Sequence, residues 1–424
     1  MIYLRALLGI LFFVAMAWML SSDRKRFQWR VVAGGIGLQL LLAWMILDTE
    51  GGRGFFDGAA GYVSKLVSMT KPGASMVFGS LADGGGPAGF IFAFAGTGLV
   101  VIIFFSALMS VLYHLGVMQV VVWALAKVMS KTMGLSGGES MASAANIFMG
   151  QTEAPLVVKP YLSKMTTSEL NALMTGGFAT IAGSVMAVYM QVLGADYAPH
   201  LMTASVMSAP ASFVIAKIIR PETELSTTAG KVELKIERSA GNLIEAAANG
   251  TSDGLRLWLN VIAMLIAFVA LVAFVNWPLG AFGGWLHGLG VLDGELTLAR
   301  LFGWVLAPVA WLIGVDGWHD CQLFGGLLGT MVSTNEFVAY TQLQGLEPGS
   351  GGAVVFASDR SAKMAAYALC GFANFASIGI QLGGITALVP ERKAELSKLA
   401  LKAMIGGAFA CWMTATIAGM FLEA

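Results

Sequence analysis

Residues 134–165, GLSGGESMASAANIFMGQTEAPLVVKPYLSKM, are typical of neither a membrane-spanning helix nor a soluble loop. The stretch is about half apolar, it is broken by Gly150 and Pro155, and its centre carries the polar run Gln151–Glu153. Non-helical backbone at membrane depth is tolerated only where it is buried in protein or lines a water-filled cavity. We therefore interpret residues 134–165 as a re-entrant hairpin, which enters a membrane and returns to the same side.

The composition of the whole chain supports a membrane setting. Of 424 residues, 57% are apolar and 12% are charged, whereas a soluble domain carries about 25% charged residues. Too little polar surface would remain to cover a soluble core, so a bilayer is the fitting solvent. The net charge is zero, which argues against a nucleic-acid binder. A secreted disulfide scaffold and a disordered regulator are excluded as well, and the three cysteines show no metal-type spacing.

Apolar windows of about 20 residues predict eight membrane spans. They lie near residues 4–20, 31–48, 89–113, 169–195, 200–219, 254–282, 354–389 and 396–422. The spans at 169–195 and 354–389 are interrupted by glycine and polar residues. Most of the Lys and Arg residues fall on one side if the N-terminus lies outside, so both termini are predicted outside the cytoplasm. The polar stretch 221–253 is predicted to be a loop between two halves.

A second hairpin is predicted within residues 298–343, where two short apolar stretches flank Gly314–Asp320. Each hairpin is followed by one interrupted span and one clean span, and the two units have opposite orientation. The predicted fold is an all-α polytopic membrane protein with about eight transmembrane helices. It also has two re-entrant hairpins in an inverted repeat and two broken helices. Inverted repeats of this kind place a substrate site near the midplane.

Four polar segments occupy matching places in the two predicted repeats, and ionisable groups within a membrane indicate function by default. The segments are Gln151–Glu153, Thr180–Val185, Thr334–Glu336 and Gly371–Ser377. Carboxylates accept hydrogen bonds from vicinal hydroxyls, and amides pair with the donor–acceptor edge of a base. No Arg or Lys accompanies these segments, so a neutral, hydroxyl-rich ligand with an aromatic ring is favoured over an anion. Hydrogen bonding between helices is the structural alternative for each residue.

Other motifs carry less weight. Gly134–Gly138 matches G-x-S-x-G around Ser136, but no strand precedes it and no histidine is placed to serve it. A phosphate-binding glycine loop is not found in the sequence. We interpret Asp359-Arg360 as a local, structural ion pair and residues 114–131 as an amphipathic helix on the inner membrane surface.

Several motifs resemble signatures of the concentrative nucleoside transporters, and the resemblance covers essentially the whole chain. The motifs are GQTEAPL at 150–156, NEFVAY at 335–340, ALCGFANF at 368–375, SIGIQLGG at 377–384 and GGFATIAGS at 176–184. The resemblance implies a multi-pass protein of a bacterial inner membrane that is not an enzyme. It also implies a homotrimer among membrane lipids, in which a mobile transport domain moves like an elevator against a scaffold.

The domain boundaries are predicted on the same basis. Residues 1–113, with part of 254–282, are assigned to scaffold helices, and 114–220 to the first repeat of the transport domain. Residues 221–297 are assigned to a cytoplasmic loop and a scaffold helix, and 298–424 to the second repeat.

The resemblance further implies specific roles for residues of this chain. The base is expected to be held by Gln151, Thr152 and Glu153, with Val185 alongside. The ribose is expected to be held by Glu336, Asn374 and Ser377, with Phe372 contacting the ligand. Sodium is expected at Asn146, Met149, Thr180 and Ile181, with Met149 and Ile181 contributing backbone carbonyls. One departure is Met331, which stands where the family usually has a lysine before its Asn-Glu-Phe motif.

The resulting prediction is import of nucleosides similar to uridine, with adenosine and deoxynucleosides as further candidate substrates, driven by a sodium gradient. A proton symporter with Glu153 or Glu336 as the proton carrier is the alternative of the same class. An intramembrane hydrolase using Ser136 or the paired glutamates, and a passive channel, are less favoured.

Overall fold

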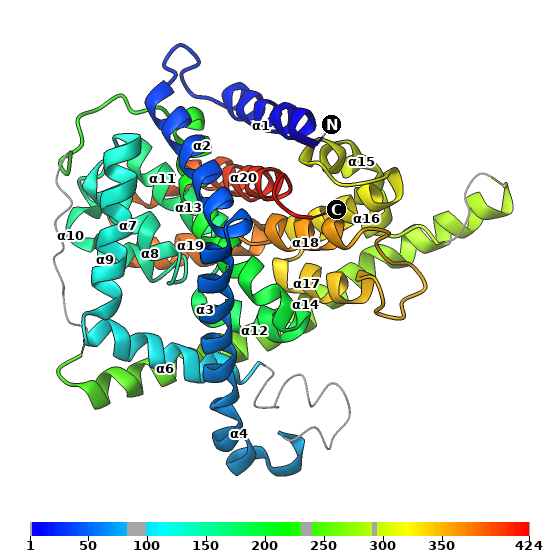
Figure 1. Ribbon diagram of the computed structural model, residues 1–424, viewed down its shortest axis with the longest axis horizontal. Coiled ribbons are helices and arrows are strands. Elements are labelled where there is room, and N and C mark those ends of the chain that lie inside the picture. The colour runs from blue at the N-terminus through cyan, green and yellow to red at the C-terminus, as the bar shows by residue number, and fades with distance from the viewer. Residues whose placement is uncertain (1, 83–98, 230–239, 291–294, 424) are drawn as a thin grey trace.

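The computed structural model of the chain describes residues 2–82, 99–229, 240–290 and 295–423, and these residues form helices without any strand (Figure 1). The helices are α1 Ile2–Met19, α2 Trp29–Ala43 with a π-helical extension Trp44–Asp48, α3 Glu50–Ser68, α4 Thr70–Phe78, α6 Val101–His114, α7 Val117–Met133, α8 Gly137–Asn146, α9 Ala154–Val157, α10 Lys159–Leu162, α11 Thr167–Ala179, α12 Gly183–Leu193, α13 Ala198–Ile219, α14 Leu243–Gly288, α15 Leu298–Ile313, α16 Trp318–Ser333, α17 Glu336–Leu346, α18 Asp359–Ala368, α19 Phe375–Leu388 and α20 Lys393–Ala418. Short 3₁₀ turns at Gly79–Leu81, Ala195–Tyr197 and Pro390–Arg392 complete the regular structure.

The helix lengths confirm a multi-pass membrane protein. Among the described residues, six helical segments are long and apolar enough to cross a membrane, or up to eight if each of two bent helix pairs counts as one span. The predicted span 89–113 is seen as α6 from Val101 onward, and residues 89–98 lie outside the described part of the chain. Residues 50–78, where no span is predicted, form α3 and α4.

The two predicted repeats are visible as two series of helices in the same order. A lead helix (α7 or α15) precedes a hairpin (α8 to α10, or α16 and α17), a broken helix (α11/α12 or α18/α19) and a long helix (α13 or α20). The lead helix α7 turns by 78° from α6, in keeping with the amphipathic helix predicted at 114–131. Helix α19 of the second repeat contacts α11 of the first, and α12 of the first repeat packs against α17 of the second, so the two repeats are in direct contact (Figure 1).

The second hairpin is shorter than the predicted range 298–343. Its arms are α16 and α17, and its tip is the break between Ser333 and Glu336. The turn at Gly314–Asp320 instead joins α15 to α16 with a 110° bend. Sequence patterns did not separate α15 from the hairpin because both consist of short apolar stretches with similar breaks.

Both broken helices are confirmed. The first is interrupted at residues 180–182, between α11 and α12, and the second at residues 369–374, between α18 and α19. Asn374 adopts extended backbone and its side chain accepts a hydrogen bond from the backbone N–H of Ser377, so it begins α19. Breaks of this kind free backbone groups at membrane depth, where they line protein or a cavity.

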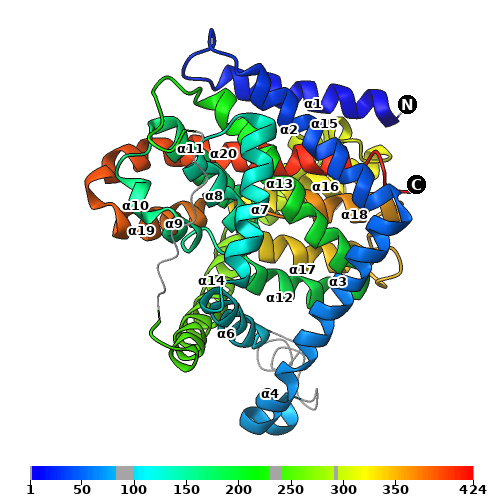
Figure 2. The same cartoon turned by 60° about the vertical axis from the view of Figure 1, so that its left-hand side comes forward.

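The centre of the molecule is formed by α11, α13, α18 and α20, most of whose residues are buried. Helices α1 and α2 pack on this centre, α1 against α13, α15 and α20, and α2 against α7 and α13 (Figure 2). Both broken helices and both hairpins are therefore held on a common, tightly packed body.

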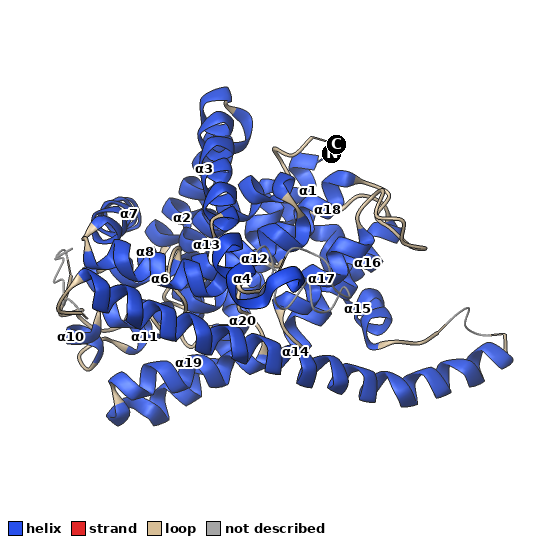
Figure 3. Cartoon of the chain, turned by 90° about the horizontal axis from the view of Figure 1, so that it is seen from below, coloured by secondary structure: helices blue, strands red, loops and turns tan. Residues whose placement is uncertain are grey.

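Helix α14 differs from every other helix. It has 46 residues, about 70 Å at 1.5 Å per residue, and it packs mainly on α6 along one side of the molecule (Figure 3). No residue in its most apolar window is buried within the chain, which suits contact with lipid or another subunit. The predicted loop 221–253 was too long, because Asn242 caps the helix by accepting a hydrogen bond from the backbone N–H of Glu245 at 2.9 Å.

Candidate functional site

The tips of the two hairpins and the two helix breaks meet at one cavity of about 620 Å³, within the size range of small-molecule sites. All eight residues predicted to contact the substrate line it: Gln151, Thr152, Glu153, Val185, Glu336, Phe372, Asn374 and Ser377. The structure thus brings together residues that are more than 220 positions apart in the sequence.

Glu336 is the most strongly fixed group in the cavity wall. It is the first residue of α17 and is 6% exposed. Its Oε1 accepts a hydrogen bond from the hydroxyl of Tyr189 at 2.8 Å, and its Oε2 accepts one from Nδ2 of Asn374 at 2.8 Å. The N-terminus of α17 favours a negative charge there. Both carboxylate oxygens therefore have one donor each and retain further acceptor capacity for a ligand.

Asn374 has a defined amide orientation because both of its ends are used. Its Oδ1 accepts from the backbone N–H of Ser377 at 2.8 Å, and its Nδ2 donates to Glu336. Asn374 therefore both caps the start of α19 and orients the carboxylate of Glu336. Asn335 plays the corresponding capping role for α17, where its Oδ1 accepts from the backbone N–H of Val338 at 2.9 Å.

The tip of the first hairpin packs on the second repeat. A Cβ added to Gly384 of α19 would lie 2.6 Å from Cγ2 of Thr152, so only glycine permits this approach. Gly177 of α11 has a similar role, since its added Cβ would lie 3.0 Å from Cβ of Gln151. Gln151 is 6% exposed and its Oε1 has no hydrogen-bond partner in the described structure, which leaves an acceptor available at the cavity wall.

Glu153 is less constrained than Glu336. Its side chain is exposed within the chain, and its carboxylate accepts one long hydrogen bond, from the backbone N–H of Gly150 at 3.4 Å. No salt bridge to Glu153 is found among the described residues. The carboxylate is consequently free to accept hydrogen bonds from a ligand.

The sequence patterns missed two parts of the cavity wall. Tyr189, the donor to Glu336, lies one helical turn after Val185 on α12, so the i, i+4 spacing is a signal that could have found it. The opposite wall comes from α14, and its residues are Leu257, Asn260, Val261, Ala263, Met264, Leu265 and Ala267. Asn260 is a polar residue in an otherwise apolar run, which is the signal expected of a cavity-facing position.

The four predicted sodium ligands lie where the first hairpin meets the break between α11 and α12. The backbone N–H of Gly183 donates to the carbonyl of Phe148 at 3.0 Å, which joins the segment holding Asn146 and Met149 to that holding Thr180 and Ile181. Asn146 is 1% exposed, and neither its Oδ1 nor its Nδ2 has a partner in the described structure. Thr180 is buried, and its hydroxyl donates to the carbonyl of Gly176 at 3.0 Å.

This donor set suits a hard monovalent cation. Amide, hydroxyl and carbonyl oxygens are the ligands that such ions prefer, and the unpartnered amide of Asn146 requires a partner in a buried place. Among the described residues no group of three or more His, Cys, Asp or Glu side chains is arranged to hold a metal. A transition-metal centre is therefore not supported in the described part of the chain.

Three other sequence interpretations can be compared with the structure. Met331 is fully buried in α16, one turn before the hairpin tip. Ser136 is the N-cap of α8, and its hydroxyl donates to Oε1 of Glu169, so its role is structural. The proposed Asp359-Arg360 pair is wrong, because Arg360 pairs with Asp316 at 2.8 Å and Asp359 pairs with Lys363.

Two hairpins and two broken helices that enclose one cavity are the features of a membrane transporter of the inverted-repeat kind. The chain matches family profiles described as "Na⁺ dependent nucleoside transporter N-terminus" (residues 8–81), "Nucleoside recognition" (97–196) and "Na⁺ dependent nucleoside transporter C-terminus" (200–419). The chain belongs to the concentrative nucleoside transporter family, whose members are transporters and not enzymes.

Two relatives illustrate the breadth of the match. An uncharacterized transporter of Haemophilus influenzae is 43% identical over 420 residues, which cover 99% of this chain and 98% of that protein. The rat sodium/nucleoside cotransporter 1 is 41% identical over 423 residues, which cover 97% of this chain and 63% of the rat protein. The chain therefore spans less than two thirds of the mammalian protein.

Solved structures match over nearly the whole chain. The transporter CNTnw in an inward-facing, substrate-bound state is 40% identical with a TM-score of 0.88, covering 99% of both chains. A double variant of CNTnw in an outward-facing state is 40% identical with a TM-score of 0.90, covering 99% of this chain and 98% of the other. The predicted fold class is thereby confirmed.

Proposed function

We propose that this protein is a secondary active symporter that imports nucleosides, uridine among them, together with sodium. The observation that carries this proposal is the single cavity that collects all eight predicted substrate residues from both repeats. Relatives named as sodium/nucleoside cotransporters, similar over nearly the whole chain, support the substrate class and the ion.

The cavity has two chemically different sides that suit the two parts of a nucleoside. Glu336 and Asn374, fixed by mutual hydrogen bonding, are suited to the vicinal hydroxyls of a ribose. Gln151 and Thr152 at the first tip are suited to the edge of a base, since an amide and a hydroxyl both donate and accept. Phe372 supplies an aromatic face to the ligand.

Coupling follows from the shared position of the first hairpin. Its segment 146–149 approaches the break at 180–181, and the same hairpin ends in Gln151 and Thr152. A sodium ion that joins these segments would fix the tip before the nucleoside binds. Each ligand should then raise the affinity for the other by the same factor.

A proton symporter with Glu153 or Glu336 as the carrier is the alternative of the same class. Glu336 accepts hydrogen bonds on both oxygens from Tyr189 and Asn374, an arrangement that suits an ionised carboxylate. Glu153 and Glu336 both line the cavity, so each is a candidate carrier in that alternative.

The proposed movement is an elevator-type displacement of the packed body past α14 and α6. Support comes from the cavity wall, in which one side belongs to α14 and the other sides to the repeats. We further propose a homotrimer that uses the uncovered α14 surface, in a bacterial inner membrane with both termini outside the cytoplasm.

The proposal is tested by uptake of radiolabelled uridine into proteoliposomes at fixed pH. Inward gradients of sodium and of choline are compared, with other nucleosides as competitors. Accumulation of intact uridine only with sodium is expected. Equal uptake with choline would overturn sodium coupling. Accumulation in choline that appears only when an inward proton gradient is imposed would identify a proton symporter, and equilibration under every gradient would identify a passive channel.

The sodium ligands are tested separately with Thr180→Ala. The substitution removes one oxygen from the proposed site and leaves the substrate cavity lining unchanged. The half-saturating sodium concentration should rise by about tenfold, whereas uptake at saturating sodium should stay near that of the wild type. An unchanged sodium requirement would remove Thr180 from the ligand set.

A further inference from the structure

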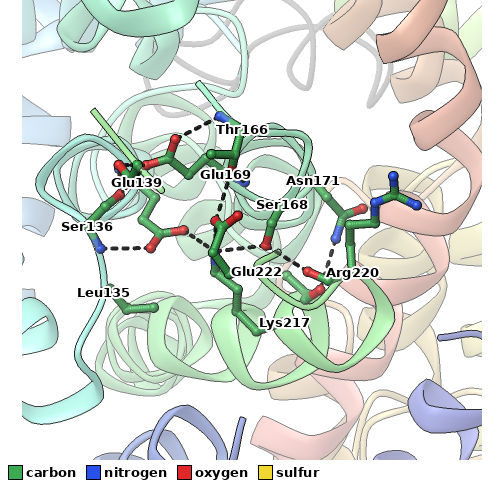
Figure 4. A network of polar contacts seen from close by, with 12 residues as sticks. Leu135, Ser136, Glu139, Thr166, Ser168, Glu169, Asn171, Lys217, Arg220 and Glu222 are labelled. Atoms are coloured by element: carbon green, nitrogen blue, oxygen red, sulfur yellow. Dashed lines mark hydrogen bonds and ion pairs between the residues drawn. The ribbon is translucent and has the colours of Figure 1, made fainter. Parts of the chain in front are cut away.

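A cluster of buried charges joins three helices of the first repeat outside the cavity lining (Figure 4). We name it the Lys217 cluster, and its members are Glu139 of α8, Glu169 of α11, Lys217 of α13 and Glu222 of the following loop. Nζ of Lys217 lies 2.6 Å from Oε2 of Glu139, 3.4 Å from Oε2 of Glu222 and 2.9 Å from Oγ of Ser168. The side chains of Lys217 and Glu139 are only 2% and 3% exposed.

Residues of the cluster also cap the N-termini of two helices. Ser136 and Glu139 form a capping box at the start of α8, and Thr166 and Glu169 form another at the start of α11. The two boxes are joined, because the Ser136 hydroxyl donates to Oε1 of Glu169 at 2.5 Å. The N-termini of α8 and α11 are therefore linked to each other as well as to Lys217.

The loop after α13 closes over the same helix starts. The carbonyl of Thr228 accepts from the backbone N–H of Gly137 at 2.9 Å, and its hydroxyl accepts from that of Gly138 at 3.0 Å. Ser226 donates to Oε1 of Glu169 at 2.5 Å. The loop thus occupies backbone donors that the first turn of a helix leaves unpaired.

Lys217 is the one cation among the four members of the cluster. Its two acidic partners, Glu139 and Glu222, come from α8 and from the loop after α13, and its ammonium group also donates to the Ser168 hydroxyl in the first turn of α11, so it joins three segments. Removing one partner of a buried ion pair leaves the other charge uncompensated and is strongly destabilising for the local arrangement. Loss of Lys217 is therefore expected to separate the starts of α8 and α11.

The two helices lead from the cluster to the proposed cation site. Helix α8 carries Glu139 in its first turn and Asn146 as its last residue, and α11 carries Glu169 in its first turn and is followed by Thr180. The helices pack against each other. A shift of one helix by one residue would move its far end by about 1.5 Å, which is large against the few tenths of an ångström that metal–ligand distances tolerate.

We propose that Lys217 and Glu139 are positioning residues for the cation: the Lys217 cluster sets the axial register of α8 against α11, and so the separation of Asn146 and Thr180. This inference rests on the proposed sodium site. It assigns a role in ion affinity to residues that neither line the cavity nor belong to the predicted ligand set.

The chain contains a matched control in its second repeat. Arg360 of α18, 1% exposed, pairs with Asp316 at 2.8 Å and donates to the carbonyls of Gly314 and Gly419. Asp320 accepts from the backbone N–H groups of Ala357 and Ser358. This Arg360 cluster also joins a hairpin arm, a broken helix and a long helix, but its hairpin carries none of the predicted cation ligands.

The experiment compares Lys217→Met, Lys217→Arg and Arg360→Met with the wild type in proteoliposomes. The readouts are the half-saturating sodium concentration, the half-saturating uridine concentration at saturating sodium, and the sodium-dependent rise in melting temperature in detergent. Lys217→Met should raise the half-saturating sodium concentration by about 10- to 100-fold, as observed when partners of metal ligands are removed. Its uridine requirement at saturating sodium should stay near that of the wild type. Lys217→Arg should restore most of the sodium affinity, because it keeps the charge.

Arg360→Met should lower the melting temperature and leave the half-saturating sodium concentration unchanged. An equal sodium shift in Arg360→Met, or no shift in Lys217→Met, would overturn the inference. If either protein does not fold, Glu139→Gln and Asp316→Asn form the milder pair, and a sodium shift in Glu139→Gln alone is expected. A wild-type protein that needs no sodium would overturn the proposed function itself, whereas a sodium-dependent wild type with an unaffected Glu139→Gln would overturn only this inference.

Discussion

The tips of the two hairpins occupy matching places, yet their acidic residues are held differently. Glu336 begins α17, is buried, and accepts hydrogen bonds from Tyr189 and Asn374. Glu153 is exposed within the chain and accepts one 3.4 Å hydrogen bond from its own loop. The two carboxylates therefore differ in how much of their geometry is fixed before a ligand arrives.

This difference separates two tasks within one cavity. A group that is fixed in advance loses little conformational freedom when the ligand binds, and it discriminates strongly between ligands that match its donors and ligands that do not. A mobile carboxylate adapts to several partners. We infer that Glu336 contributes most to recognition of an invariant part of the ligand, whereas Glu153 tolerates variation.

The largest expected effect is that of Glu336→Gln. The new amide would place an N–H₂ group against the Tyr189 hydroxyl or the Asn374 amide, both of which donate to the native side chain. Hydrogen bonds to charged groups contribute about 1.5–3 kcal/mol, so uridine uptake below saturation should fall by about 10- to 100-fold. Competition by deoxy-analogues tests whether the loss comes from contact with the ribose hydroxyls. Equal fractional losses for uridine and 2′,3′-dideoxyuridine would contradict such a contact.

Gly384→Ala tests the fixed position of the first tip. The added methyl group would lie 2.6 Å from Cγ2 and 2.9 Å from Cβ of Thr152, so the tip must move. Overpacking of this kind costs about 1–3 kcal/mol, and the half-saturating uridine concentration should rise by about 5- to 100-fold. Adding Thr152→Ser to this variant removes the nearer methyl group and should recover part of the lost affinity. A Gly384→Ala protein with native uridine affinity would show that the close approach of Thr152 to Gly384 is unimportant.

Tyr189→Phe is expected to have a smaller effect. It removes one donor from Glu336 but preserves the ring contacts with Phe337 and Tyr340. The loss of about 1 kcal/mol for one hydrogen bond corresponds to an uptake reduction of about fivefold. A double-mutant comparison with Glu336→Gln gives the measurement, because strongly non-additive losses are expected for two partners of one hydrogen bond.

The smallest effect is expected for Glu153→Gln. Glutamine retains an acceptor oxygen, and the native side chain makes only one long hydrogen bond within the chain. We expect uridine uptake at fixed pH to fall by about two- to fivefold, equivalent to about 0.5–1 kcal/mol. A loss larger than that of Glu336→Gln would reverse the comparison, and uptake that becomes independent of a pH gradient only in Glu153→Gln would favour the proton alternative.

The sequence predicted the general fold and the identity of the cavity-lining motifs well. Apolar windows find spans because backbone polar groups must be satisfied internally in lipid, which leaves a long apolar helix as the simplest solution. Polar residues such as Gln151 and Asn374 are conspicuous in such runs, so the tips and breaks could be located before the structure was known. The roles of these residues came from the resemblance to the family, and they remain predictions.

What the sequence could not provide is pairing over long distances. The i, i+4 spacing from Val185 could have placed Tyr189 on the cavity face of α12, but it could not have identified Glu336 of α17 as its hydrogen-bond partner. The sequence predicted an ion pair between Arg360 and its neighbour Asp359, whereas the bend between α15 and α16 places Asp316 beside Arg360 as the actual partner. The predicted loop 221–253 was too long, because hydropathy alone does not distinguish the polar first turns of α14, which Asn242 caps, from a loop.

The docking of each hairpin on the opposite repeat has a consequence for assembly. Thr152 of the first hairpin needs Gly384 of the second repeat, and Glu336 of the second hairpin needs Tyr189 of the first. Neither half of the polypeptide contains a finished binding surface, so a protein divided between the halves should bind nucleoside only when both fragments are produced together. During synthesis the cavity wall can be completed only after α19 has been made, because Gly384 lies in that helix.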